Sequence, residues 1–352
     1  MKKNWLIALV LICAASVAVW QIWSHSSRES SAIPTKSIRV AISPYQDIGM
    51  VVNLKPMGLE KKYGVNVDLQ TMAWEDIIPA MASKGTTADL GFASLIGYLT
   101  KQANLNNGSD DDIIFIYPAY VFKGGGFISF KPGIPVLDAK TIRDPAAMKV
   151  FFDHRIGAEK NSLFDMMLFR VATNAGIDPR SLHIVNSSLD NSLLAARNGD
   201  LDIASAGLTQ LTEARRTGGR LVLSMETAQF ADITGFVTTR RHFREKHAEI
   251  EAFIRMWFET VGYVMADPIK NSAYTRAYLD QHGATHYSPE EYAAAVGNEF
   301  FPRSIGEMNT TLLSDNGQFS MKSISDSASS YLVVNGIVRK APIRPVPFDL
   351  KP

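Results

Sequence analysis

The chain of 352 residues has a single cysteine, Cys13, which lies in an apolar segment near the amino terminus. From residue 37 onward the sequence contains no thiol. This part of the chain therefore excludes an internal disulfide, a cysteine-ligated zinc site and a cysteine nucleophile. The avoidance of cysteine is compatible with an oxidising compartment.

The chain also lacks an excess of charge of either sign, with 36 basic and 35 acidic residues. Residues 1–36 hold four of the basic residues and one of the acidic residues, so 32 basic and 34 acidic residues remain in the rest. A body this close to neutrality has no electrostatic footprint for DNA or RNA. We therefore expect no nucleic-acid partner.

Motifs of common enzymes are missing as well. The sequence contains no G-x-S-x-G nucleophile elbow and no phosphate-binding loop ending in GK[ST]. Only His282 and His286 have the i, i+4 spacing of zinc-binding helices, but Gly283 lies between them and no glutamate follows His282. We therefore expect no catalytic residue, no metal and no cofactor.

An apolar run at residues 5–23 follows two lysines. A positive end before an apolar stretch is typical of an export signal. Residues 1–23 are either a signal peptide, with Ser16-Val17-Ala18 as the cleavage site, or an uncleaved membrane anchor, since a bilayer span needs roughly 20 apolar residues. Both interpretations place the body outside the cytoplasmic membrane. Residues 24–36, with five serines and a proline, are expected to form a flexible tether.

Short β-type runs alternate with apolar helical patterns in the body of the chain. The first series predicts strands at 38–42, 65–69, 88–93 and 113–117, and helices at 48–62, at 75–84 and from 94. A second series predicts strands at 149–152, 181–186 and 201–204, and helices at 163–174 and 190–197. Helices at 245–266, 271–282 and 289–299 follow, and the last residues are extended. Strands that alternate with helices imply an α/β protein with parallel βαβ units.

The two series share a phrase. Residues 85–91 and 198–204 both contain a glycine turn, an acidic residue and a buried strand. Either chance similarity between two βαβ units or a pair of similar lobes explains the match. Gly124, Gly125 and Gly126 lie between the series and allow wide φ/ψ freedom, so we expect a hinge there. Residues 230–239 are the candidate return crossing.

Ser162 and Asp165 stand at the start of a predicted helix and form a plausible capping box. The loop before this helix, residues 157–161, is polar. In this interpretation the Ser162 hydroxyl accepts from the backbone of the first helical turn. A contact to a ligand is the alternative use of the same loop.

Four phrases in this order resemble the nitrate/sulfonate/taurine-type periplasmic substrate-binding proteins of ABC importers. They lie at residues 38–42, 58–67, 88–91 and 198–202, and the resemblance covers residues 37–223. It implies the type II periplasmic binding protein fold, in which two crossing strands join two α/β lobes and a ligand cleft lies between them. The lobes then comprise residues 37–123 with 232–352, and residues 124–231.

This sequence departs from the family pattern in three places, and the first is the leader, for which an uncleaved anchor is one of the two interpretations. The usual Asp-Leu-Lys-Gly-Lys phrase before the second lobe's first strand is replaced by residues 142–149. No obvious set of arginines for an oxyanion is present. The last of these departures puts nitrate or a sulfonate in doubt as the ligand.

The resemblance implies an extracytoplasmic receptor that closes on a small organic or oxyanionic solute and delivers it to an ABC permease. We expect a monomer in the periplasm or at the outer face of the cytoplasmic membrane. Two alternatives stay open. A membrane-anchored extracytoplasmic sensor needs a signalling partner, and a non-transport enzyme on the same fold needs a catalytic constellation.

Candidate ligand contacts follow from the rule that ligands bind at the carboxyl ends of strands in open α/β sheets. Ordinary turns, core positions and helix caps are the competing interpretation of these loops. The acidic residues among the candidates favour a polar or nitrogen-containing organic solute over an anion. The predicted ligand-binding residues are Tyr45, Gln46, Asp47, Trp74, Glu75, Ala93, Ser94, Gly157, Glu159, Asn161, Ser162, Thr209 and Asp232.

Overall fold

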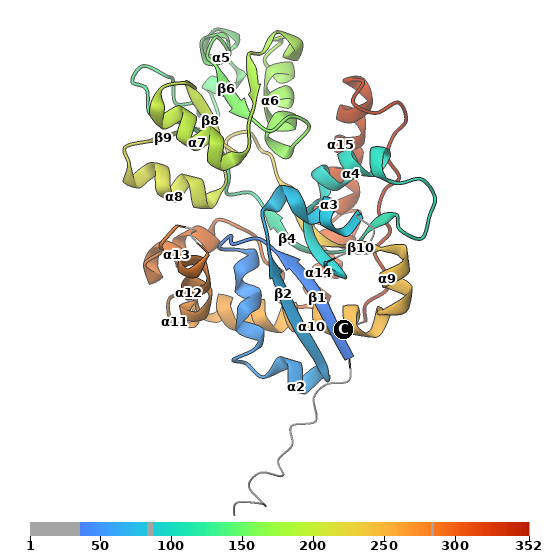
Figure 1. The fold of residues 1–352 in the computed structure, drawn as a ribbon. Coiled ribbons are helices and arrows are strands. Elements are labelled where there is room, and N and C mark those ends of the chain that lie inside the picture. Colours follow the sequence, from blue (N-terminus) through green and yellow to red (C-terminus); the bar gives the residue numbers. More distant parts are fainter. Residues whose placement is uncertain (1–35, 83–86, 283–284, 352) are drawn as a thin grey trace, which may run out of the picture.

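The computed structural model of the chain describes residues 36–82, 87–282 and 285–351 (Figure 1). The predicted leader at 1–23, Cys13 and most of the predicted tether lie outside these residues. Within the described ranges, no helix combines the length and the apolar character that crossing a bilayer requires.

The described residues contain two five-stranded sheets. The strands of the first sheet are β1 (Lys36–Ile42), β2 (Val65–Thr71), β3 (Leu90–Ser94), β4 (Ile113–Phe122) and β10 (Asp232–Thr239). Those of the second are β5 (Gly126–Ser129), β6 (Ile156–Ala158), β7 (Ile184–Asn186), β8 (Ile203–Ala206) and β9 (Arg220–Ser224).

Both sheets have the same arrangement of strands. The orders are β2-β1-β3-β10-β4 and β7-β6-β8-β5-β9. In each sheet the first three strands run parallel, and the fourth is antiparallel to both of its neighbours. The antiparallel strand comes directly after a chain crossing between the sheets, from β4 to β5 or from β9 to β10. The chain therefore passes between the lobes twice.

Helices flank each sheet, so that the molecule consists of two α/β lobes (Figure 1). Around the second sheet lie α5 (Pro145–Phe152), α6 (Leu163–Asn174), α7 (Leu189–Asn198) and α8 (Leu208–Arg216), with the short turns η3 (Thr141–Arg143) and η4 (Pro179–Ser181). Around the first lie η1 (Ile48–Leu54), α2 (Leu59–Tyr63), η2 (Trp74–Asp76), α3 (Ile77–Ala82), α4 (Leu95–Leu105), α9 (Arg240–Glu245), α10 (His247–Ala266), α11 (Pro268–Asn271), α12 (Ala273–Gln281), α13 (Pro289–Gly297), α14 (Ile305–Met308), η5 (Asn309–Leu313) and α15 (Met321–Val334).

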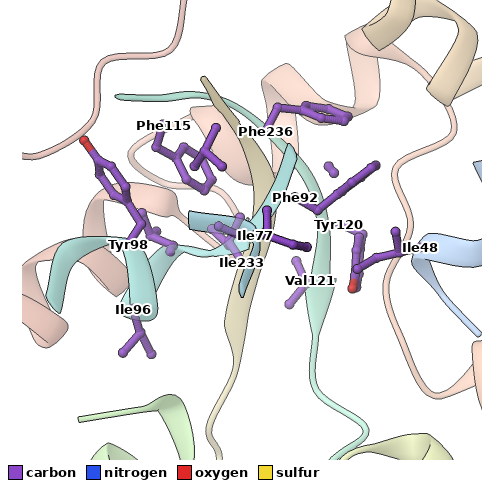
Figure 2. Packing of buried hydrophobic residues seen from close by; sticks show 14 of the residues in the cluster. Ile48, Ile77, Phe92, Ile96, Tyr98, Phe115, Tyr120, Val121, Ile233 and Phe236 are labelled. Carbon is purple, nitrogen blue, oxygen red and sulfur yellow. The ribbon is translucent and has the colours of Figure 1, made fainter. Parts of the chain in front are cut away.

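Aromatic side chains dominate the core of the first lobe. The ring centroids of Phe92 and Phe236 are 4.9 Å apart, and Trp257 of α10 lies 5.1 Å from Phe92. Figure 2 shows Phe92, Phe236, Phe115 and Tyr120 on neighbouring strands of this sheet. All of these rings are buried. Each such aromatic pair adds roughly 0.5–1.5 kcal/mol to the effect of burial alone.

The predicted strand at residues 149–152 is wrong, because this segment is the end of helix α5. Asp144 caps the helix by accepting from the backbone N–H of Ala146 at 2.9 Å, and Pro145 occupies the first helical position, which it favours. Burial of residues 148, 151 and 152, with 150 exposed, follows a helical period. The cap and the proline are therefore better indicators here than the run of apolar residues.

The predicted capping box at Ser162 and Asp165 is also wrong. Ser162 precedes α6, but its Oγ makes no hydrogen bond in the described structure and is buried. Asp165 accepts instead from the backbone N–H of Asn161 at 2.8 Å and from the Tyr331 hydroxyl at 3.1 Å. The acidic partner thus tightens the loop before the helix and links it to α15.

The three glycines at the first crossing allow neighbouring atoms to pack close to the backbone, and none of them needs an unusual backbone angle. None of Gly124, Gly125 and Gly126 has a positive φ. A Cβ at Gly124 would lie 2.7 Å from a Leu208 methyl group, and one at Gly126 would lie 2.3 Å from the Leu223 carbonyl oxygen. Neighbouring atoms therefore leave no room for a side chain at these positions, and the hinge expected at the three glycines stays a prediction.

Candidate functional site

The carboxyl ends of the parallel strands in both sheets point toward the region between the lobes. Loops after β1, β2, β3, β6, β7 and β8 enclose two adjoining cavities there, of about 60 and 280 Å³. Six residues line both cavities, so the two spaces form one cleft. They are Tyr45, Trp74, Ser94, Leu163, Phe164 and Leu189.

The loop after β1 supplies the deepest polar groups of the cleft. Asp47 caps η1 by accepting from the backbone N–H of Ile48 at 2.7 Å, and its other oxygen accepts from the Tyr120 hydroxyl at 2.6 Å. Burial raises the pKa of Asp47, although both hydrogen bonds act in the opposite direction. Gln46 is held by its backbone oxygen, which accepts from the Tyr292 hydroxyl at 2.9 Å.

The loop after β2 brings an aromatic wall to the cleft. Trp74 begins η2, and its ring lies 6.4 Å from that of Tyr45 at an interplanar angle of 55°. Glu75 follows Trp74 and is exposed at the mouth of the larger cavity. Burial raises the pKa of Tyr45, and the negative charges of nearby carboxyl groups add to the effect.

The loop after β6 faces these residues from the second lobe. Glu159, Asn161 and Ser162 line the larger cavity. Asn161 has a φ of 61°, a conformation that asparagine tolerates better than most residues. Its carbonyl oxygen accepts from the Thr100 hydroxyl of the first lobe at 3.2 Å. Burial raises the pKa of Glu159, Lys101 lowers it, and Glu75 raises it further.

Direct contacts hold the lobes together beside the cleft. The Thr209 hydroxyl, at the start of α8, donates to Gln46 Oε1 at 2.8 Å, and the Tyr287 hydroxyl donates to Thr209 at 3.4 Å. Farther out, Arg216 Nε donates to Glu291 Oε1 at 3.2 Å. Two of the predicted ligand residues therefore bond to each other across the lobes.

Three of the predicted residues do not line either cavity. Asp232 is buried at the start of β10, where it accepts from the Ser94 hydroxyl and from the backbone N–H of Ile96 at 3.3 Å. Burial raises its pKa to about 6 despite these bonds. Gly157 lies inside β6, where a Cβ would be 2.4 Å from a Leu201 methyl group, and Ala93 is buried in β3. Their positions are structural supports behind the cleft.

Sequence reasoning missed part of the lining. Leu189 and Asp190 follow β7, so the rule that pointed to the other loops applies equally to them. Tyr120 and Phe122 end the strand before the first crossing, and Phe164 begins α6. The aromatic residues at the crossing carry no sequence signal that separates them from ordinary core positions.

Two larger grooves lie elsewhere on the molecule. One, of about 880 Å³, runs beside the crossing glycines and the segment 315–327. The other, of about 960 Å³, lies under the C-terminal segment 336–348. Neither is framed by the carboxyl ends of parallel strands, so we assign the candidate site to the smaller cleft between the lobes.

Comparison with known proteins agrees with this architecture. No family model and no curated protein sequence matches the chain. Solved structures do match. The alkanesulfonate-binding protein SsuA from Xanthomonas axonopodis pv. citri, bound to MOPS, aligns at a TM-score of 0.64 and 17% identity, over 88% of this chain and 96% of that one.

The chain has the periplasmic binding protein fold. The periplasmic aliphatic sulphonate binding protein SsuA from Escherichia coli aligns at a TM-score of 0.62 and 14% identity, over 87% of this chain and 95% of that one. The desulfurization enzyme DSZB also aligns, at a TM-score of 0.53 and 12% identity, over 89% of this chain and 96% of that one. The predicted fold class is confirmed, and the fold is one that binding proteins and an enzyme share.

Proposed function

We propose that the chain is an extracytoplasmic solute-binding receptor of an ABC importer. The observation that carries the proposal is the cleft between two lobes of this fold, into which the strand-end loops of both sheets project. The export-type leader in the sequence supports a location in the periplasm or at the outer face of the cytoplasmic membrane. The partner is then a permease in that membrane, and the receptor acts as a monomer.

The proposed lobes comprise residues 37–123 with 232–352, and residues 124–231. The proposed mechanism is closure of these lobes about the two crossings, with hinges near Gly124, Gly125 and Gly126 and near residues 230–234. Solute binds to one lobe first and is buried when the second lobe rotates onto it. Ten of the thirteen predicted contacts line the cleft and are the proposed ligand-binding residues. The other three, Ala93, Gly157 and Asp232, are proposed to support the cleft from behind.

A thermal-shift panel with the purified protein tests the proposal. It contains sulfonates, nitrate, pyrimidines, amino acids and polyamines. A solute at 100 times its dissociation constant stabilises the folded state by about 2.7 kcal/mol. The account expects such a shift from one chemical class, whereas no shift across the panel would count against a solute receptor.

An enzyme on the same fold is the second candidate, and the likeness to the desulfurization enzyme DSZB favours testing it. Incubation of the protein with each stabilising solute, followed by mass spectrometry, separates the two candidates. A receptor returns its solute unchanged. Conversion of the solute at a rate that depends on protein concentration supports the enzyme instead.

A further inference from the structure

The charged side chains that line the cleft are unequal in sign. Four carboxyl groups face two ammonium groups, and neither an arginine nor a histidine lines the two cavities in the part of the chain that the structure describes. The six are Asp47, Glu75, Glu159, Asp190, Lys101 and Lys160. A site for an oxyanion needs the opposite balance, because its charge is neutralised by basic groups and N–H donors.

These six groups also lack ion partners, although Asp190 accepts from Gln210 Nε2 at 2.8 Å. None of them forms an ion pair within 4.0 Å with any residue that the structure describes. Carboxyl groups elsewhere do pair, as Asp89 with Lys246 at 2.7 Å and Glu259 with Lys62 at 2.6 Å. Glu75 and Asp190 are exposed to water, whereas Asp47 is buried. A buried carboxylate without a counter-charge is unfavourable. A cation bound in the cleft would supply the missing partner.

Asp47 is the strongest case. It is only 3% exposed and lines the smaller cavity, and its two bonds come from a neutral hydroxyl and a backbone N–H. Burial raises its pKa, as expected for a carboxyl group with no basic neighbour. A positive charge in the cavity would lower this pKa and be attracted in return.

Tyr45 shares the lining of a cavity with each of the four carboxyl groups, with Asp47 in the smaller cavity and with the other three in the larger one. Burial is the main cause that raises the pKa of Tyr45, and the negative charges of Asp190, Glu75, Asp47 and Glu159 follow in that order. The place where these charges converge is therefore next to Tyr45, between the two lobes. Tyr45 and Trp74 also offer aromatic faces, which attract cations within about 6 Å.

Gln46 offers a hydrogen-bond donor to a ligand in the cleft. The side chain is 2% exposed and lines the smaller cavity, and its Oε1 accepts from Thr209. Its Nε2 donates no hydrogen bond to any residue in the described ranges. A buried amide with a free donor is satisfied by an acceptor atom on the ligand. Phe122 and Phe164 complete an apolar wall around this point.

We propose that the cleft takes a small organic cation, an amine or a protonated nitrogen heterocycle with an apolar or aromatic body and a hydrogen-bond acceptor. The cationic nitrogen lies beside Tyr45 among the four carboxyl groups. This inference rests on the proposed receptor function and names the substrate class of that same cleft.

Titration calorimetry of the full chain tests the charge preference with probes of three kinds. They are a panel of organic amines, led by benzylammonium, choline and spermidine, the neutral benzyl alcohol, and the anions benzenesulfonate and taurine. We expect an amine to bind at least roughly 30-fold more tightly than any anion, the ratio that corresponds to about 2 kcal/mol. A sulfonate that binds while every amine fails overturns the inference but supports a receptor.

Charge-removing variants locate the binding. Glu75→Gln and Glu159→Gln are each expected to weaken the amine by about tenfold, because each removes one favourable charge. Asp153→Asn is the matched control, since Asp153 is exposed in the second lobe and lines neither cavity. The affinity of this variant for the amine should not change. An amine affinity that both cleft variants leave intact overturns the inference. A complete absence of binding by every class counts against the receptor itself.

Discussion

The two lobes have the same strand order but differ in the length of their strands and in the packing of their cores. The first sheet carries strands of five to ten residues and packs against the 20-residue helix α10. The second has strands of three to five residues. A separate, smaller cluster of aliphatic residues, several of them alanine, packs on one part of this sheet. The first lobe thus has the longer strands, and the second lobe has the shorter ones.

One local arrangement recurs in both lobes. In the first, Asp89 precedes β3 and accepts from the backbone N–H of Arg39 at 2.9 Å, with the Arg39 side chain and Lys246 as ion partners. In the second, Asp202 precedes β8 and accepts from the backbone N–H of Arg155 at 2.8 Å. The side chains of Arg155 and Lys131 are its ion partners.

This recurrence explains the phrase shared by residues 85–91 and 198–204. In each lobe an aspartate just before β3 or β8 accepts from the backbone of a residue in β1 or just before β6, and it forms ion pairs with two basic side chains. The side chain of Asp89 is 1% exposed, whereas that of Asp202 is 14% exposed. Removal of the aspartate charge should therefore destabilise the first lobe more, because the basic groups there lose a more deeply buried partner. Paired substitutions measure that difference.

We expect the largest difference between the lobes for substitutions in their hydrophobic cores. Trp257→Ala removes a fully buried ring that contacts Phe92 and Phe236, and we expect it to lower the free energy of unfolding by about 4 kcal/mol. Leu211→Ala, in the aliphatic cluster of the second lobe, should cost about 2 kcal/mol. Urea unfolding followed by circular dichroism gives both values. Equal losses would contradict the difference between the lobes.

The aspartates come next. Asp89→Asn leaves Lys246 and the Arg39 side chain without their buried counter-charge, and should lower the free energy of unfolding by about 3 kcal/mol. Asp202→Asn should lower it by about 1 kcal/mol, because Asp202 itself is more exposed than Asp89 and water replaces the lost charge. The urea midpoints of the two variants are compared directly. A larger loss at Asp202 would reverse the comparison.

The contribution of Asp89 to stability should also depend on pH. Burial opposes the ionisation of Asp89, but hydrogen bonds from Arg39 and Lys246 outweigh it and lower its pKa from 3.8 to about 2. Because the folded-state pKa is the lower one, this stability is complete above about pH 4 and is lost as the pH falls toward 2. A shift of this size corresponds to about 2 kcal/mol. Asp89→Asn should unfold with a flatter pH dependence in this range, which thermal scans at stepped pH would measure.

The smallest effect concerns the contact between the lobes. Arg216→Ala removes the pair with Glu291, in which the two side chains are 34% and 41% exposed, so the free energy of unfolding should fall by only about 0.5 kcal/mol. Arg180→Ala breaks a pair with Asp178 inside the second lobe and serves as the control. If the pair helps to hold the lobes together, only Arg216→Ala should widen the distribution of distances between them. Identical distributions in both variants would exclude such a role.

The alternation of strands and helices made the fold predictable, because β-type runs, glycine stops and apolar periodicity are local signals. The cleft loops were predictable in the same way, since each follows a strand end. The misassigned segment 149–152 shows the limit, because four apolar residues fit either element and Asp144 with Pro145 decide for a helix.

Long-range packing accounts for the remaining misses. The partner of Asp165 is Tyr331, which lies 166 residues away, so no local pattern could announce it. The filled space around Gly124 likewise depends on Leu208 and Glu299, which come from the other end of the chain or the opposite lobe. Such contacts exist only once the lobes have been brought together.

The most direct test of the account is a distance between the lobes with and without solute. Spin labels at Val150→Cys in α5 and Ile269→Cys in α11, both exposed positions, report on it in a background where Cys13 is replaced by serine. We predict that the solute class giving the largest thermal shift narrows and shortens the distance distribution, since closure buries the solute. An unchanged distribution at saturation would contradict a receptor that closes on its ligand.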